Sequence, residues 1–198
     1  NAYFTNARSN RNKTMEENIY YPDADAYKEV VFGIYVKEDI ISNGETVILA
    51  NSLVDVITLN ADGKGISNTD LPTGKYYLKE IKTAKGYVLL DKEFDFEFKY
   101  SNQNETLQEI NLNDTYGEIV NEVIKGYVAI TKTSSLDGRE LADAEYGIYR
   151  KSDDELIENL KTDADGKAQS SLLPYGEYYL KEIKAPTHFK VNENVYDF

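Results

Sequence analysis

The sequence predicts a mainly β chain that is built from two related domains in tandem. The run Tyr-Tyr-Leu-Lys-Glu-Ile-Lys occurs at residues 76–82 and again at residues 178–184. The chain has 17 Tyr, is rich in Val, Ile and Thr, and has few long helical patterns, a composition typical of strands. A repeat of this length indicates separate domains in succession, because solenoid repeats are much shorter.

The similarity of the two halves extends well beyond these seven residues. An Asp-Gly pair precedes each copy, at residues 62–63 and 165–166, and predicts a hairpin turn in each half. The other matching segments keep the same order in both halves: residues 31–37 with 145–151, 61–64 with 164–167, 71–74 with 173–176, and 86–96 with 188–198 without a gap.

The first domain is expected to cover residues 7–123. Residues 9–27 are polar and irregular, with a short helix at 14–19 and a loop at 23–26. Turn signals at residues 43–44, 62–63 and 73–74 separate the strands that follow. These strands are expected at residues 30–36, 45–50, 54–59, 75–82, 94–100, 106–112 and 118–123.

The second domain is expected to cover residues 124–198, after a short junction at Lys125-Gly126. A junction without a Pro- or Ser-rich spacer favours a semi-rigid rod. No segment corresponds to the closing strand 118–123, so we expect this domain to lack its last strand and the chain to be part of a longer protein. Its strands are expected at residues 127–133, 144–150, 156–161, 166–171, 177–184 and 195–198.

Residues 1–6 are interpreted as the tail of a preceding domain. The segment is apolar and ends in Asn6, as a closing strand would. Asn6 precedes Gly33 by nearly the same spacing as Asn121 precedes Gly147, which favours this interpretation.

Charge and composition exclude several functions. With 35 acidic and 22 basic residues the net charge is −13, which argues against binding to nucleic acid or to an anionic membrane surface. No window is long and apolar enough for membrane insertion. No signal peptide is present, which indicates an intracellular chain or the mature part of an exported one. Without Cys, disulfides cannot stabilise the fold.

No cofactor or metal ion is expected. The run Asp163-Ala164-Asp165-Gly166 has part of a calcium-loop pattern but lacks the remaining acidic ligands, so a hairpin turn is favoured. His188 is the sole His, and no second His or Cys is available for a zinc site or a hydrolase triad.

Two glutamates are predicted to lie on apolar strand faces. Side chains alternate along a strand, so Glu80 shares a face with Leu78, and Glu182 shares a face with Leu180. An ionised carboxylate on a buried face is costly unless it is paired or protonated. Its occurrence in both copies favours a function for this Glu.

Two more polar side chains occupy comparable positions. Lys132 alternates in register with Val128 and Ile130, and Asn121 shares a face with Ile119. Each alone has an ordinary structural explanation, such as a Lys whose ammonium reaches solvent. Together, an inward Lys on a first strand, an inward Glu on a middle strand and an inward Asn on a last strand favour a common site.

These residues resemble those of a known family, the B-type repeats of Gram-positive collagen adhesins (CnaB) and the related SpaA-type pilin domains. The resemblance rests on residues 178–186, 144–149 and 130–132 in the second domain, and on residues 76–86 and 120–121 in the first. It implies an all-β chain of two tandem antiparallel Ig-like (CnaB-type) β-sandwiches, the second without its last strand. It also implies an intramolecular isopeptide bond between Lys and Asn, assisted by Glu.

The implied chemistry agrees with general principles. A desolvated Lys has a lowered pKa, and the neutral amine is the nucleophile. The fold holds the Asn carboxamide close, and a protonated Glu carries protons while ammonia leaves. Because each domain reacts once, this is self-crosslinking without turnover, and the protein is not expected to be an enzyme.

The matching residues are incomplete in both copies. In the first domain Glu80 and Asn121 match, and Lys13 is the best available Lys, although its neighbours are polar. Lys13 lies five residues further from Gly33 than Lys132 does from Gly147, so either an insertion intervenes or the first domain lacks the bond. In the second domain Lys132 and Glu182 match, but no Asn follows Phe198. One hypothesis is intermolecular: residues 3–6 of a neighbouring molecule would supply Asn6 to the open second domain.

The function predicted is a structural stalk or pilin-type module of a surface protein in a Gram-positive cell wall. Its partners would be neighbouring domains of the same longer protein. The alternative is an adhesin in which one sandwich face binds a host extracellular-matrix protein or glycan, with exposed Tyr as contact residues.

Overall fold

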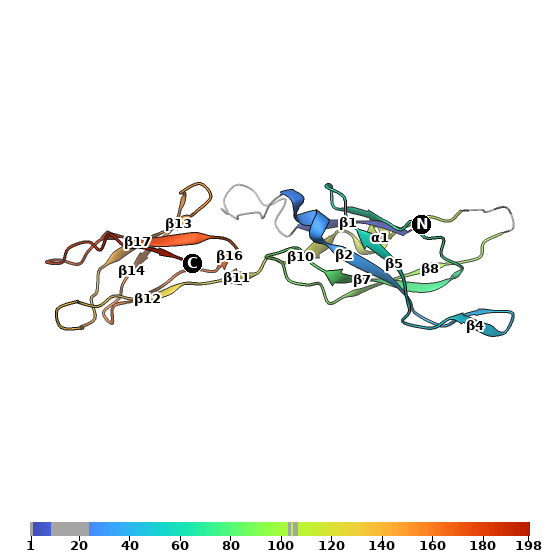
Figure 1. The fold of residues 1–198 in the computed structure, drawn as a ribbon, viewed down its shortest axis with the longest axis horizontal. Coiled ribbons are helices and arrows are strands. Elements are labelled where there is room, and N and C mark those ends of the chain that lie inside the picture. Colours follow the sequence, from blue (N-terminus) through green and yellow to red (C-terminus); the bar gives the residue numbers. More distant parts are fainter. Residues whose placement is uncertain (1, 9–23, 103, 105–106) are drawn as a thin grey trace. The chain divides into compact units, whose positions relative to one another are not determined.

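The computed structural model of the chain describes residues 2–8, 24–102, 104 and 107–198. These residues form two compact units, the first ending at Val123 and the second comprising residues 124–198. Antiparallel β-sheets dominate both units, and helix within the described ranges is limited to one 3-10 helix and one short α-helix (Figure 1). The predicted fold class, two antiparallel all-β domains in tandem, is confirmed.

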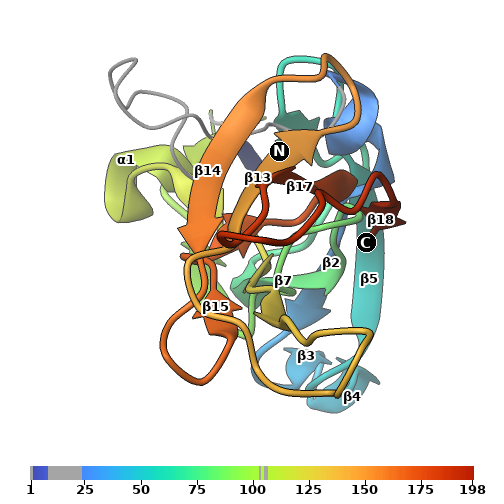
Figure 2. The same ribbon diagram turned by 90° about the vertical axis from the view of Figure 1, so that its left-hand side faces the viewer.

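Each unit is built on a four-stranded antiparallel sheet. In the first unit the order is β5 (Leu53–Thr58), β2 (Val31–Val36), β7 (Gly74–Lys82) and β8 (Glu93–Phe98). In the second unit the order is β14 (Leu156–Lys161), β13 (Glu145–Arg150), β17 (Tyr178–Lys184) and β18 (Val195–Asp197), as Figure 2 shows.

The register of the two sheets also agrees. Phe32 pairs with Glu80 across β2 and β7, and Tyr146 pairs with Glu182 across β13 and β17. In each sheet a register shift lies immediately before this pair. Glu80 and Glu182 therefore occupy equivalent places in the two units.

The alternation of apolar and charged residues explains why these strands form. In β8, Phe94, Phe96 and Phe98 are buried while the acidic residues between them are exposed. A period of two is the pattern of a strand with one face on a core and the other in solvent.

The second sheet of the first unit is centred on β1 (Ala2–Arg8). It pairs antiparallel with β6 (Lys64–Ile66) and parallel with both β9 (Ile110–Asn111) and β10 (Ile119–Asn121). The structure thus places residues 2–8 within the first unit, whereas the sequence indicated the tail of a preceding domain. The backbone of β1 finds partners on both of its edges inside this unit, which explains the difference.

A short helix interrupts the end of the first unit. The sequence indicated one strand at residues 106–112. Of the described residues 107–112, only Ile110–Asn111 is strand, and α1 (Leu112–Tyr116) follows. The Asn111 side chain accepts a hydrogen bond from the backbone N–H of Asn113 at 3.1 Å and caps the helix. Leu112 is buried in the core, so the helix returns the chain to the sheet.

Beside its main sheet, the second unit has two separate two-stranded sheets. β12 (Ala129–Thr131) pairs with β15 (Lys167–Gln169), and β11 (Lys125–Gly126) pairs with β16 (Leu173–Pro174). The apolar core of this unit contains residues such as Tyr146, Ile148 and Leu180, with Val128 and Ile130 packed against it. Lys132, one residue beyond β12, lies at the edge of this core.

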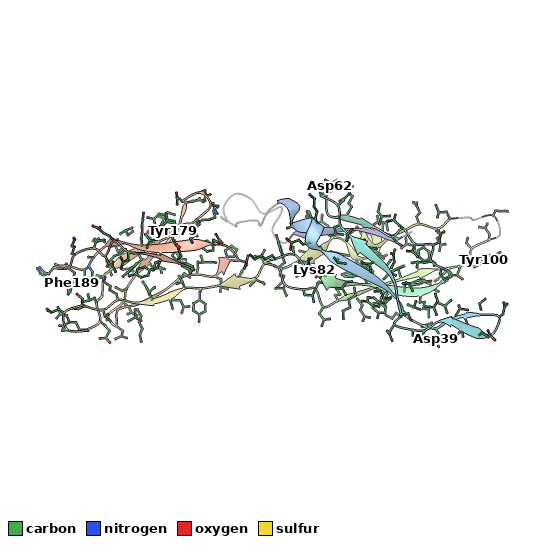
Figure 3. The ribbon with its side chains drawn as sticks, viewed as in Figure 1. Asp39, Asp62, Lys82, Tyr100, Tyr179 and Phe189 are labelled. Atoms are coloured by element: carbon green, nitrogen blue, oxygen red, sulfur yellow. The ribbon has the colours of Figure 1, made fainter. Side chains whose placement is uncertain are left out.

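The turns form where the sequence predicted them. Asn43 and Gly44 both have positive φ, 52° and 84°, and join β3 (Ile40–Ser42) to β4 (Glu45–Ile48) in a two-residue turn. Figure 1 shows this hairpin beyond the end of the main sheet, and Figure 3 places Asp39 beside it.

The run at Asp163 is a turn, as the sequence favoured. Its Oδ1 accepts hydrogen bonds from the backbone N–H groups of Asp165 and Lys167 at 2.9 and 2.8 Å. Asn60 makes the same two contacts in the first unit. No cluster of three metal-ligating side chains occurs among the residues that the structure describes.

Two segments before β2 remain to be placed. Residues 24–29 form a 3-10 helix, η1 (Ala24–Glu29), where the sequence indicated a loop up to residue 26. Ala26 and Tyr27 are buried in the core, which accounts for the ordered turn. The helix expected at residues 14–19, and Lys13, lie outside the described residues. Within the described part of the chain, no helix has the length and apolar character needed to cross a membrane.

Candidate functional site

Both repeated glutamates are buried. Glu80 is 1% exposed and Glu182 is 5% exposed, on strands whose neighbouring inward residues are Leu78 and Leu180. Placing a carboxylate on this face is costly in free energy unless other groups satisfy it. The contacts of each Glu therefore define a candidate site.

In the first unit, the partner of Glu80 is Asn121. The Nδ2 atom of Asn121 lies 2.9 Å from Oε1 and 2.8 Å from Oε2 of Glu80. The same nitrogen lies 3.1 Å from the carbonyl oxygen of Val88 and 3.2 Å from the hydroxyl of Thr83. Asn121 is 3% exposed, so this carboxamide is held in a dry and well-defined position.

Burial raises the pKa of Glu80 above its ordinary value. Hydrogen bonds from the backbone N–H of Leu90, from Asn121 and from Thr83 oppose this rise without cancelling it. The Leu90 bond is short, 2.6 Å to Oε2. The carboxyl of Glu80 thus holds a proton more tightly than the carboxyl of an exposed Glu does.

In the second unit, the partner of Glu182 is Lys132. The Nζ atom lies 3.0 Å from Oε1 and 3.2 Å from Oε2, and the two side chains are 13% and 0% exposed. Oε1 is buried and accepts no aligned hydrogen bond, although Nζ is near it. Oε2 accepts a hydrogen bond of 2.6 Å from the backbone N–H of Asn192.

A neighbouring Tyr reports on the same environment. Tyr146 stands opposite Glu182 in the register, where Phe32 stands opposite Glu80. Burial and the charge of Glu182 raise the pKa of Tyr146 to about 12. The interior of the second unit thus disfavours further negative charge beside this carboxylate.

The structure brings together two of the predicted pairs. Glu80 with Asn121 and Glu182 with Lys132 are each in contact, at equivalent places in the two units. The two other predicted residues are not in such a pair: Lys13 lies outside the described residues, and Asn6 lies on β1 of the first unit. Of the predicted Lys, Glu and Asn, the first unit thus contains a Glu and an Asn in contact, and the second unit contains a Glu and a Lys in contact.

Sequence reasoning missed the backbone groups that hold each carboxylate. Leu90 and Asn192 both donate their N–H from a position ten residues after the Glu. The signal was present in the sequence, because the segments after the two glutamates align without a gap. The contacts of Thr83 and Val88 had no sequence signal, since they depend on the course of the loop after β7.

The strand tyrosines are engaged within each unit. Tyr35 stacks on Tyr77 with ring centroids 5.1 Å apart, and Tyr149 stacks on Tyr179 at the same distance. Tyr179 is labelled on β17 in Figure 3. These pairs are the cross-strand packing expected of Tyr in a sheet.

A family model matches most of the chain. The model for the SpaA prealbumin-like fold domain matches residues 23–115 and 126–198, one match in each unit.

Known proteins of similar sequence or structure include a streptococcal surface protein. Over 46 residues the chain is 41% identical to the trypsin-resistant surface T6 protein of Streptococcus pyogenes serotype M6, a match that covers 23% of this chain and 8% of that protein. The structure of the Bacillus anthracis TIE protein is similar over 100% of this chain and 30% of that chain, with a TM-score of 0.69 and 28% identity.

A C-terminal fragment of the pilus adhesin SpaC from Lactobacillus rhamnosus GG shares the fold. The similarity covers 100% of this chain and 81% of that fragment, with a TM-score of 0.50 and 12% identity. This chain therefore spans a small part of the T6 and TIE proteins and most of the SpaC fragment.

Proposed function

Since this chain belongs to the SpaA family of prealbumin-like fold domains, we propose that it is a structural stalk or pilin-type module of a Gram-positive surface protein. The proposed module lies outside the cell, is anchored to the wall through the rest of a longer protein, and has neighbouring domains as its partners. Its chemistry is an autocatalytic Lys-Asn isopeptide crosslink assisted by a buried Glu. The alternative of a host-binding adhesin has less support, because the strand tyrosines pack against each other.

The observation that carries this proposal is the buried contact between Lys132 and Glu182. Their closest atoms are 3.0 Å apart, and the carboxylate is fully buried. A lone Lys and Glu buried together add little net stability, because the cost of desolvating both charges offsets their attraction. Chemistry between them is a better reason for this arrangement than stability.

The reaction requires a proton transfer inside the pair. When the ammonium of Lys132 gives a proton to Glu182, a neutral amine and a neutral acid replace two buried charges. The neutral amine can then attack a carboxamide carbon held beside it. Glu182 gives that proton to the leaving nitrogen and takes a second proton from the attacking nitrogen, so the C–N bond of the carboxamide breaks, ammonia departs and the new amide bond remains.

The first unit indicates where the carboxamide belongs. Asn121 holds its Nδ2 within 2.9 Å of both oxygens of Glu80, which is equivalent to Glu182. A last strand that places an Asn beside Glu182 in the same way would complete Lys, Glu and Asn around one point. Residues 97–123 carry such a strand, and Phe198 corresponds to Phe96 in the aligned segments.

A chimeric chain tests this proposal. We would append a copy of residues 97–123 after Phe198, so that the second unit gains a closing strand with its Asn. The expected result is a denatured mass lower by one ammonia and a crosslinked peptide that joins Lys132 to the appended Asn. Lys132→Arg in the same chimera keeps the charge but removes the nucleophile, and Glu182→Gln removes the proton carrier, so both should retain the full mass.

Hydrogen exchange distinguishes the outcomes. If the appended strand is protected from exchange, and therefore docked, yet the chimera keeps its full mass, the proposed chemistry is refuted. If the chimera loses ammonia in the Glu182→Gln variant as well, the role assigned to Glu182 is refuted while the crosslink stands.

A further inference from the structure

The register of β1 identifies the counterpart of Lys132 in the first unit. In the second unit, Thr131 on β12 pairs with Lys167 on β15, just after the Asp-Gly turn. In the first unit, Thr5 on β1 pairs with Lys64 on β6, at the same place after its own Asp-Gly turn. The residue after Thr131 is Lys132, and the residue after Thr5 is Asn6.

The pairing of β1 with β10 is compatible with this assignment. The two strands run parallel, with Asn6 opposite Ile119 and Arg8 opposite Asn121. Position 6 is therefore two residues from Asn121 along a neighbouring strand. Such positions have Cα atoms about 8 Å apart, a span that a Lys and an Asn side chain can bridge together.

Neither Asn6 nor Arg8, the two residues of β1 that lie opposite Ile119 and Asn121, has an amine that could act as the nucleophile. Asn6 has a carboxamide, and the guanidinium of Arg8 stays protonated in proteins. The first unit thus has the Glu and the Asn of the reaction, in contact at 2.8 Å, and a carboxamide residue at the register position of the Lys.

We propose that Asn6 is the residue that keeps the first unit uncrosslinked: it occupies the position of the nucleophilic Lys, and Glu80 with Asn121 forms a noncovalent clamp between β7 and β10. This inference rests on the proposed function, because it assigns the missing component of the same chemistry. It predicts that Asn6→Lys is sufficient to make the first unit form its crosslink.

The competing source of an amine is Lys13, which the sequence favoured. Lys13 lies five residues beyond Arg8, the position directly opposite Asn121. A crosslink to Lys13 would require the chain to turn back toward Asn121 after β1. The experiment below therefore has a separate outcome for Lys13.

The test compares the full chain with its Asn6→Lys variant by mass spectrometry under denaturing conditions. We expect the wild-type chain to have the mass calculated from its sequence. We expect the Asn6→Lys chain to lack one ammonia, with one peptide pair joined between residues 6 and 121. Asn6→Arg adds the same charge without a nucleophile, and Asn6→Lys with Glu80→Gln removes the proton carrier, so both should keep the calculated mass.

A second variant pair tests the register without relying on Asn6→Lys folding correctly. Ala7 lies directly opposite Val120 across β1 and β10. Cα atoms of directly opposite residues on adjacent strands are close enough for a disulfide. We expect Ala7→Cys with Val120→Cys to form one on mild oxidation. Failure of this disulfide in a folded chain would overturn the register, and with it the assignment of Asn6.

The remaining outcomes separate this inference from the proposed function. A wild-type chain that lacks ammonia and is joined between Lys13 and Asn121 would overturn the inference and support the chemistry. A folded Asn6→Lys chain that keeps its mass, while the chimera described above reacts, would also overturn the inference alone. If the chimera is docked and unreactive, the proposed function itself fails.

Discussion

At the scale of single residues, the two buried glutamates at equivalent places in the two units have different side-chain partners. Glu80 has a carboxamide as its nearest side-chain partner, and Glu182 has an ammonium. Both also receive one short hydrogen bond from a backbone N–H ten residues further along the chain. The backbone contact is therefore the constant part of the site, and the side-chain partner is the part that differs between the units.

The raised pKa of Glu80 makes a prediction about pH. The folded chain binds this proton more tightly than the unfolded chain, in which the carboxyl has its ordinary pKa of 4.5. The contribution of Glu80 to stability is therefore fully present below that value and is lost as pH rises through the raised, folded-state pKa. In Glu80→Gln this dependence should be absent.

The measurement is the melting temperature of wild type and Glu80→Gln by calorimetry over a series of pH values that starts at the ordinary pKa of Glu and rises from there. The other carboxylates are common to both chains and cancel in the difference. We expect wild type to lose stability relative to Glu80→Gln as pH rises. A difference that is constant with pH would contradict the raised pKa.

A second prediction concerns the partner of Glu182. Lys132→Met removes the cation and leaves a fully buried carboxylate without its counter-charge. Breaking a buried pair on one side costs about 3–5 kcal/mol of unfolding free energy. Lys132→Met with Glu182→Gln removes both charges and keeps an acceptor for the N–H of Asn192, so most of the loss should be recovered. Urea unfolding gives both values, and equal stability of the single and double variants would contradict the pairing.

At the scale of elements, local patterns explain which parts of the fold the sequence could predict. β14 was predicted at its observed bounds, and β7 and β17 within one residue. In β17 buried and less buried residues alternate from Tyr178 to Glu182, as the sequence predicted. The burial of Glu80 and Glu182 on these strands followed from the same alternation. Their contacts with Asn121 and Lys132 link strands that are far apart in the sequence. The sequence suggested these contacts because Asn121 and Lys132 were also predicted to point inward.

Other elements depend on pairing that local pattern does not encode. β6, β11 and β16 have two or three residues each, too few to show a period. α1 has five residues and depends on the Asn111 cap and on burial of Leu112. The place of β1 was missed for the same reason: an apolar strand that ends in Asn fits a last strand, and only the pairing with β6 identifies it as a first strand.

A prediction at this scale concerns Gly147 on β13. A Cβ atom there would lie 2.5 Å from Cε2 of Tyr149, and Tyr149 is stacked on Tyr179 and lies under the ammonium of Lys181. Gly147→Ala should displace this ring and cost about 1–3 kcal/mol. Gly126→Ala on β11 is the control, because a Cβ atom added there would have no atom within 4 Å outside the adjacent residues of the chain.

Thermal unfolding of the two variants tests this packing. Gly126→Ala should change stability by no more than about 0.5 kcal/mol. If Gly147→Ala is equally mild, the stacked Tyr pair does not restrict this position.

At the scale of the whole molecule, the first and last strands of a unit decide how it responds to tension. β1 and β10 are adjacent and parallel in the first unit. Force on the start of β1 and the end of β10 pulls the two strands in opposite directions along their length. Their hydrogen bonds are then loaded together, which is the strongest arrangement for noncovalent strands, but it still ruptures and lets the unit extend.

A crosslink between residues 6 and 121 would carry this load covalently. Because we infer that the natural first unit lacks it, we expect single-molecule pulling of the wild-type chain to show a rupture followed by extension of about 3.5 Å for each residue released. In the Asn6→Lys chain, the residues between positions 6 and 121 cannot extend, so this event should be absent. Asn6→Arg should extend as wild type does, which separates the effect of the bond from that of the charge. If Asn6→Lys molecules that mass spectrometry shows to be crosslinked still release this full length, the load does not pass through β1 and β10, and the crosslink cannot protect a stalk in the way proposed.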